Sequence, residues 1–173
     1  NLVATDLERF VDAAGRADAV KDVRKKIDAA GITYVYYQFP SVTGRIMGKG
    51  VPSPHWETIA QKGFQLVYGA TANLFTDRHG NYIGYGPEAA ELVGVPEPET
   101  FMPLPWDDRV ARVWVTCFRN REEREDPGAF LTSDCRANLK QIQADFEKDT
   151  GLHLRAGTEP EMMWLKLKED GTP

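Results

Sequence analysis

The sequence lacks any apolar run near the 18 residues that a membrane-spanning helix requires. It has two cysteines, Cys117 in an apolar stretch and Cys135 near a helix start, and we expect both to be unpaired and reduced. It also lacks a basic excess, since the net charge is −5 and acids and bases are mixed. This balance argues against nucleic acid or an anionic membrane as the main partner. The sequence also lacks a signal-peptide pattern, and together these features predict a cytoplasmic protein.

Histidine is scarce as well. His55, His79 and His153 are scattered and have no His or Cys neighbour at ligand spacing, so a zinc site is not expected. Ser53 and Ser133 are predicted helix caps, and no base accompanies either in a nucleophile arrangement.

The patterning predicts an α+β protein. A capping box at Thr5 opens a short helix, and a second helix runs from about Asp18 to Ala30 and is stopped by Gly31. Strands are predicted over 32–39, 45–51 and 110–118, with helices over 54–62 and from 132 to 151, while 63–86 is expected to be an irregular loop. The charged stretch 119–128 is a candidate linker. We expect an N-terminal helical segment at 1–31, a β-rich domain at 32–120 and a further, incomplete domain at 121–173.

Two carboxylates open the last apolar stretch, in the run Gly157-Thr158-Glu159-Pro160-Glu161. From Leu152 onward the pattern predicts a strand, where residues two apart share a face. Glu159 and Glu161 then lie about 7 Å apart, a spacing that suits oxygen ligation of two neighbouring hard cations such as Mg²⁺ or Mn²⁺. The alternative is a strand end in water with two solvated acids, and Pro160 favours an edge or a bulge.

Four stretches resemble the glutamine synthetase family, in the family's order. The run Gly-x-Glu-x-Glu at 157–161 resembles the start of its catalytic domain, where the two Glu bind the active-site metals. The other three are Val42–Pro52, which resembles its second strand; Pro96–Thr100 with Leu104-Pro105-Trp106; and Asp126-Pro127 with the helix at Arg136–Leu139. The resemblance covers about Ile32 to Pro173.

The resemblance implies a β-grasp-like N-terminal domain, followed by the first helix and strand of a glutamine-synthetase-type catalytic domain. It implies ATP and Mg²⁺ or Mn²⁺ as cofactors, with Glu159 and Glu161 as metal ligands. It further implies glutamate and an amine as substrates, and a ring-shaped homo-oligomer in which the loop 63–86 of one subunit completes the next subunit's site. The catalytic residues of the family lie mostly beyond this sequence, which we expect to be the front part of a longer protein.

One position departs from the family. Its ammonia-using members carry an Asp-Gly-Ser-Ser-like turn whose Asp belongs to the ammonium pocket. Here the matching stretch is Val67-Tyr68-Gly69-Ala70, with Tyr68 in place of the Asp. An aromatic wall suits an organic amine, aryl or alkyl, better than ammonium. The alternatives are that the alignment is shifted by one residue or that Tyr68 is a packing residue.

The sequence therefore predicts an ATP-dependent ligase that joins the γ-carboxylate of glutamate to an organic amine through γ-glutamyl phosphate. An ordinary glutamine synthetase that uses ammonia is one alternative. A non-catalytic β-grasp interaction module is the other.

Overall fold

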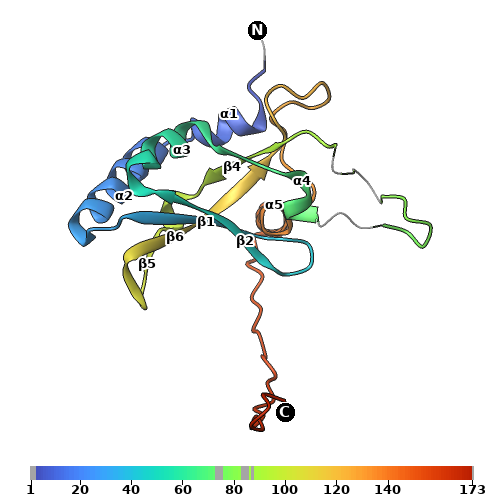
Figure 1. Cartoon of the computed structure of the whole chain (residues 1–173). Helices are drawn as coiled ribbons and strands as arrows, with labels where there is room; N and C mark the ends of the chain where they lie inside the picture. The colour runs from blue at the N-terminus through green and yellow to red at the C-terminus, as the bar shows by residue number, and fades with distance from the viewer. Residues whose placement is uncertain (1–2, 73–75, 83–85, 87, 173) are drawn as a thin grey trace. The chain divides into compact units, whose positions relative to one another are not determined.

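The computed structural model describes residues 3–72, 76–82, 86 and 88–172. These residues form an α+β fold with one mixed six-stranded sheet (Figure 1). The chain divides into two compact units, Asn1–Gln141 and Ile142–Pro173, and the sheet lies in the first. None of the described helices is both long and apolar enough to cross a membrane. The expected start of a catalytic domain at residue 121 stays a prediction.

The two N-terminal helices form where the sequence predicts them. At the start of α1 (Asp6–Val11), the Glu8 amide donates to the Thr5 hydroxyl at 3.2 Å, and the Thr5 amide donates to the Glu8 carboxylate at 2.7 Å. This completes the predicted capping box. Helix α2 (Arg16–Ala30) ends at Gly31, whose φ of 65° is the left-handed conformation that glycine adopts without a steric penalty.

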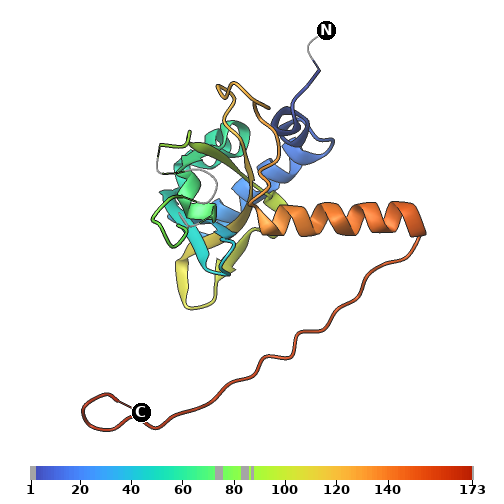
Figure 2. The same cartoon turned by 90° about the vertical axis from the view of Figure 1, so that its right-hand side faces the viewer.

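The first hairpin and the longest strand form the centre of the sheet. β1 (Tyr34–Pro40) pairs antiparallel with β2 (Ile46–Pro52) and parallel with β6 (Asp107–Phe118). The strand order is β2-β1-β6-β4-β3, and β5 pairs with β6 in a hairpin that projects from the sheet, yellow in Figure 2. The three strands that the sequence predicts in this domain are confirmed, and β6 begins three residues earlier than expected.

The region after residue 63 holds elements that the sequence does not predict. They are β3 (Phe64–Leu66), α4 (Tyr68–Ala72), β4 (Leu92–Pro96) and β5 (Met102–Leu104). β3 and β5 are too short for a periodicity, and β4 is buried at every position, so it shows no alternation. The expected irregular loop at 63–86 is wrong for its first part, and its residues 73–75 and 83–85 lie outside the described residues.

Both faces of the sheet carry packed side chains. On one face α2 packs with the helix predicted at 54–62, which is a 3-10 turn η1 (Ser53–His55) followed by α3 (Trp56–Lys62) (Figure 1). A second cluster joins α1 to β4 and β6 and contains Leu7, Val93, Val95 and Phe118. Neighbouring residues within β4, and within β6, point to opposite faces of the sheet and belong to different clusters. The two strands therefore lie between two small cores.

Helix α5 (Cys135–Thr150) is continuous across the division between the units (Figure 2). It begins after Asp134 and is followed by Gly151, whose φ of 68° ends it as the sequence predicts. The residues from Leu152 to Lys168 are extended and exposed, and among the described residues they pair with no strand. The strand predicted there is therefore not formed within this chain, because a strand needs a partner for its backbone groups.

Candidate functional site

Tyr68 lines a cavity of about 520 Å³ in the first unit. Helix α4 supplies Tyr68, the start of β4 supplies Leu92, and the segment after β6 supplies further wall residues, which include Phe130 and Leu131. The Tyr68 carbonyl accepts a hydrogen bond from the Thr71 hydroxyl at 2.9 Å, and Thr71 is itself buried. The aromatic residue predicted for an amine pocket thus borders a cavity of the size that holds small ligands.

The cavity wall contains acidic side chains, although the predicted pocket residues 67–70 include none. Four carboxylates line it, those of Glu88, Glu123, Glu125 and Asp126. Two guanidinium groups accompany them, and one of these, Arg119, lies 3.9 Å from the Glu123 carboxylate. The excess of negative charge favours a cationic ligand such as an ammonium group.

Backbone contacts hold this acidic wall in place. The Arg119 amide donates to the Ala129 carbonyl at 2.8 Å, and the Leu7 amide of α1 donates to the Gly128 carbonyl at 2.9 Å. Asp126 has a φ of 47°, a left-handed conformation that aspartate tolerates better than most residues. The segment that the sequence suggests as a linker at 119–128 is therefore anchored to α1 and to the end of β6.

Only one of the four residues predicted for the amine pocket lines this cavity. Val67 is 63 % exposed and does not border it. Gly69 and Ala70 are half-buried, and Ala70 packs against the core cluster under the sheet. Tyr68 also packs against that cluster. Tyr68 thus packs against the core and also borders the cavity, so the packing alternative is compatible with the predicted pocket role, which stays a prediction.

Glu159 and Glu161 lie in the second unit, where both are exposed. Their segment forms neither a helix nor a strand in the structure, so the shared face that the sequence predicts for them stays a prediction. No group of three or more His, Cys, Asp or Glu side chains among the described residues is arranged to hold a metal ion. Two carboxylates alone do not make a closed Mg²⁺ site, although carboxylate oxygen is the donor that such ions prefer.

A buried carboxylate that the sequence does not single out lies where β4 ends. Glu97 is 1 % exposed. Its Oε1 accepts hydrogen bonds from the Thr116 hydroxyl at 2.7 Å and from Arg136, and its Oε2 accepts from Lys140 Nζ at 2.7 Å. Burial on its own raises the pKa of Glu97, but the three donors together hold that pKa below its ordinary value. The carboxylate is therefore ionised at neutral pH.

The signal for this cluster was present in the sequence. Glu97 directly follows an apolar strand, between two prolines, and a carboxylate at such a buried position requires partners. Arg136 and Lys140 are four residues apart on one helix, so they lie on one face. What the sequence does not reveal is that β4 and α5 are neighbours, because β4 has no recognisable strand pattern.

No protein-family model and no curated protein sequence matches this chain. Its structure does match solved structures of GmaS, a glutamine-synthetase-like γ-glutamylmethylamide synthetase. The match to a GmaS–ADP complex has a TM-score of 0.58 and 21% identity and covers 74% of this chain and 26% of GmaS. The match to GmaS without ligand has a TM-score of 0.56, 21% identity, and covers 71% of this chain and 25% of GmaS.

This likeness establishes the fold. The chain spans about a quarter of the length of the GmaS chains that it matches. The structural match agrees with the resemblance to the glutamine synthetase family that the sequence predicts.

Proposed function

We propose that this chain belongs to a glutamine-synthetase-like ligase that joins the γ-carboxylate of glutamate to an organic amine, with ATP as the phosphoryl donor. The observation that carries the proposal is the match of 74% of the chain to GmaS, in the same chain that contains the Gly-x-Glu-x-Glu run. GmaS has been solved as an ADP complex, which fits an ATP-dependent reaction. We also propose that the sheet is β-grasp-like, since its first strand, β1, is parallel to its last strand, β6.

In the proposed reaction, a γ-carboxylate oxygen of glutamate attacks the terminal phosphorus of ATP, and ADP leaves. The amine nitrogen then attacks the carbonyl carbon of γ-glutamyl phosphate, inorganic phosphate leaves, and the nitrogen loses a proton. Divalent ions neutralise phosphate charge in such transfers. Glu159 and Glu161 would hold them as carboxylate ligands, with further ligands from outside the described residues.

The cavity that contains Tyr68 is the proposed amine site. Its carboxylates attract the protonated amine, and Tyr68 supplies an aromatic surface against the alkyl or aryl part. A carboxylate in the wall is also a suitable acceptor for the proton that the nitrogen must lose before attack. Ammonia lacks the apolar part that Tyr68 would contact, so the pocket favours an organic amine.

We also propose that the intact protein is a ring-shaped homo-oligomer. The resemblance supports this assembly, because in the family one subunit's N-terminal domain completes the neighbour's site. The described part of the expected contributor, 63–72, 76–82 and 86, includes α4 with Tyr68.

The direct test is a product assay on the intact protein. Glutamate, ATP and Mg²⁺ or Mn²⁺ are combined with ammonia or with single alkyl and aryl amines, and the γ-glutamyl amide and ADP are quantified by mass spectrometry. The proposal expects amide formation that requires ATP and is fastest with an organic amine. Glutamine as the main product supports an ordinary glutamine synthetase, and no amide with any amine supports a non-catalytic module.

A further inference from the structure

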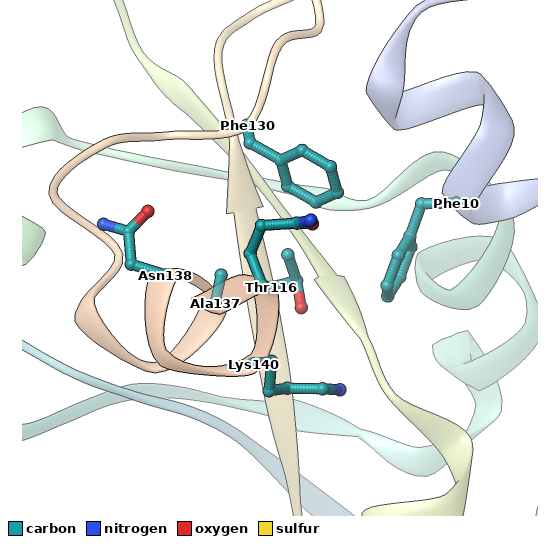
Figure 3. A pocket seen from close by; sticks show the side chains of 7 residues that line it. Phe10, Thr116, Phe130, Ala137, Asn138 and Lys140 are labelled. Atoms are coloured by element: carbon teal, nitrogen blue, oxygen red, sulfur yellow. The ribbon is translucent and has the colours of Figure 1, made fainter. Parts of the chain in front are cut away.

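A second cavity lies on the sheet face that α1 and α5 approach. It has a volume of about 290 Å³, and its apolar lining comes from Phe10, Phe130 and Ala137. Thr116 and Lys140 are among its polar lining residues. Figure 3 shows the Phe10 ring on one side and helix α5 on the other, with Thr116 and Phe130 between them. All of these residues belong to the first unit.

The polar end of this cavity carries positive charge. Thr116 and Lys140 both donate to the buried Glu97 carboxylate, which Arg136 also contacts. One carboxylate therefore faces two cations, and one positive charge remains without a matching anion within this cluster. The Lys140 side chain is 50% exposed, whereas the Glu97 side chain is 1% exposed. A ligand in the cavity thus meets the Lys140 ammonium and not the Glu97 carboxylate.

Contacts between aromatic rings support the apolar end. Phe118 packs against Phe10 with ring centroids 5.3 Å apart and against Phe130 with centroids 5.1 Å apart. The Arg16 guanidinium lies 5.0 Å from the Phe10 ring centroid, and Arg16 itself is anchored by its hydrogen bond to the Ala60 carbonyl at 2.9 Å. Because each wall ring is fixed by a neighbour, little side-chain entropy is lost when a ligand enters.

We propose that this cavity is a binding site for a small carboxylate with an aromatic body. Its volume lies at the lower end of the range for small-molecule pockets, which limits the ligand to about one ring and a short acidic arm. The ring packs against Phe10 and Phe130, and the carboxylate pairs with the Lys140 ammonium. The Lys140 ammonium is half-exposed and lines the cavity while it is bonded to Glu97, and Glu97 has Arg136 and Thr116 as further donors.

The site is separate from the cavity that contains Tyr68, and the two share one wall residue. Phe130 lines both cavities. Ligands of opposite charge are expected at the two sites, a cation beside the carboxylates around Tyr68 and an anion beside Lys140. The proposal does not depend on ligase activity, because it rests on the cavity and its own residues.

Phenylacetate is the probe, measured by calorimetric titration of the intact protein. Phenethylamine has the same ring and the opposite charge, and acetate has the charge without the ring. The proposal expects saturable binding of one phenylacetate per chain and at least tenfold weaker binding of both comparison compounds. Binding of phenethylamine as tight as that of phenylacetate, or no saturable binding of phenylacetate, overturns it.

Three variants locate the binding. Lys140→Gln removes the cation and is expected to weaken phenylacetate binding about fivefold or more. Ala137→Leu fills the cavity without changing any charge and is expected to weaken binding to a similar degree. Lys148→Gln removes an exposed lysine from the last turn of the same helix and should leave binding unchanged. Wild-type affinity in both Lys140→Gln and Ala137→Leu, with melting temperatures that show folded protein, overturns the proposed location.

Discussion

The Asp134 carboxylate accepts a hydrogen bond from the backbone amide of Cys117, 17 residues earlier in the chain, at 2.8 Å. Its other oxygen accepts from the Ala137 amide at 2.9 Å and so caps the first turn of α5. Asp134 is 2% exposed. One buried side chain therefore fixes the start of the last helix to the end of the central strand, beside both cavities.

Asp134→Ala is expected to lower the free energy of unfolding by about 2–4 kcal/mol. The change removes a helix cap and leaves the buried Cys117 amide without an acceptor, and each loss costs on the order of 1–2 kcal/mol. Urea denaturation monitored by circular dichroism measures the effect. Asp108→Ala, at an exposed aspartate of β6, is the matched control and should change stability by less than about 0.5 kcal/mol. Equal effects of the two substitutions would contradict the role of Asp134.

Glu97→Gln is expected to destabilise the protein by about 2 kcal/mol at pH 7. It leaves Arg136 and Lys140 without their anion, and the partial exposure of both cations moderates the cost. The same denaturation measurement tests this. A stability equal to that of wild type would show that Arg136 and Lys140 are solvated independently of Glu97.

The effect of Glu97→Gln should also depend on pH. The folded-state pKa of Glu97 lies below its ordinary value of 4.5. A lowered pKa means that the stabilisation is fully present above pH 4.5 and is lost as the pH falls through the folded-state pKa. The difference between wild type and Glu97→Gln should therefore shrink as the pH falls below 4.5. A difference that stays constant over this range would exclude Glu97 ionisation as its source.

Glu161→Ala is expected to abolish ligation in the intact protein without changing its melting temperature. Glu161 is exposed in its unit, so it contributes nothing to a core there, and its proposed role is to bind an ion. Glu159→Ala should behave in the same way. Glu169→Ala, at an exposed acid in the same unit, serves as the control and should retain activity. Full activity of Glu161→Ala would end the two-metal interpretation.

The assembly prediction is tested by light scattering on the intact protein. The measured molar mass is expected to correspond to an oligomer of many subunits, because we propose that a neighbouring subunit completes the site. A polypeptide of these 173 residues alone should show no ligase activity. A fully active monomer would contradict the prediction.

The sequence predicts best those elements whose signals are local. The Thr5–Glu8 capping box and the stop at Gly31 depend on neighbours within one turn, and both appear in the structure as predicted. The 12-residue strand β6 is long enough for its alternation to be visible. The elements that sequence reasoning misses, β3, β4 and β5, are short or buried on both sides and depend on their partners for their conformation.

The same distinction holds for the candidate site. A resemblance marks the position of Tyr68 and predicts a pocket role for it, and in the structure Tyr68 lines a cavity. The carboxylates opposite it come from residue 88 and residues 123–126, and no sequence pattern links those positions to Tyr68. Glu97 likewise meets Arg136 and Lys140 across about forty residues, a contact that only the fold creates.

The amine preference depends most directly on Tyr68. Tyr68→Asp restores the acid that the family's ammonia-using members carry, so it should raise the kcat/KM for ammonia relative to organic amines by roughly 10- to 100-fold. Val67→Asp is the matched control, because Val67 is exposed and does not line the cavity. An unchanged ranking in Tyr68→Asp would place the amine site elsewhere.

The central claim is that the protein is a ligase for glutamate and an organic amine. It is tested by kcat/KM for ammonia and for a series of alkyl and aryl amines, measured on the wild-type intact protein with ATP and Mg²⁺ or Mn²⁺. The account predicts that the best organic amine exceeds ammonia by roughly 10-fold or more. A higher kcat/KM for ammonia than for every organic amine would contradict it.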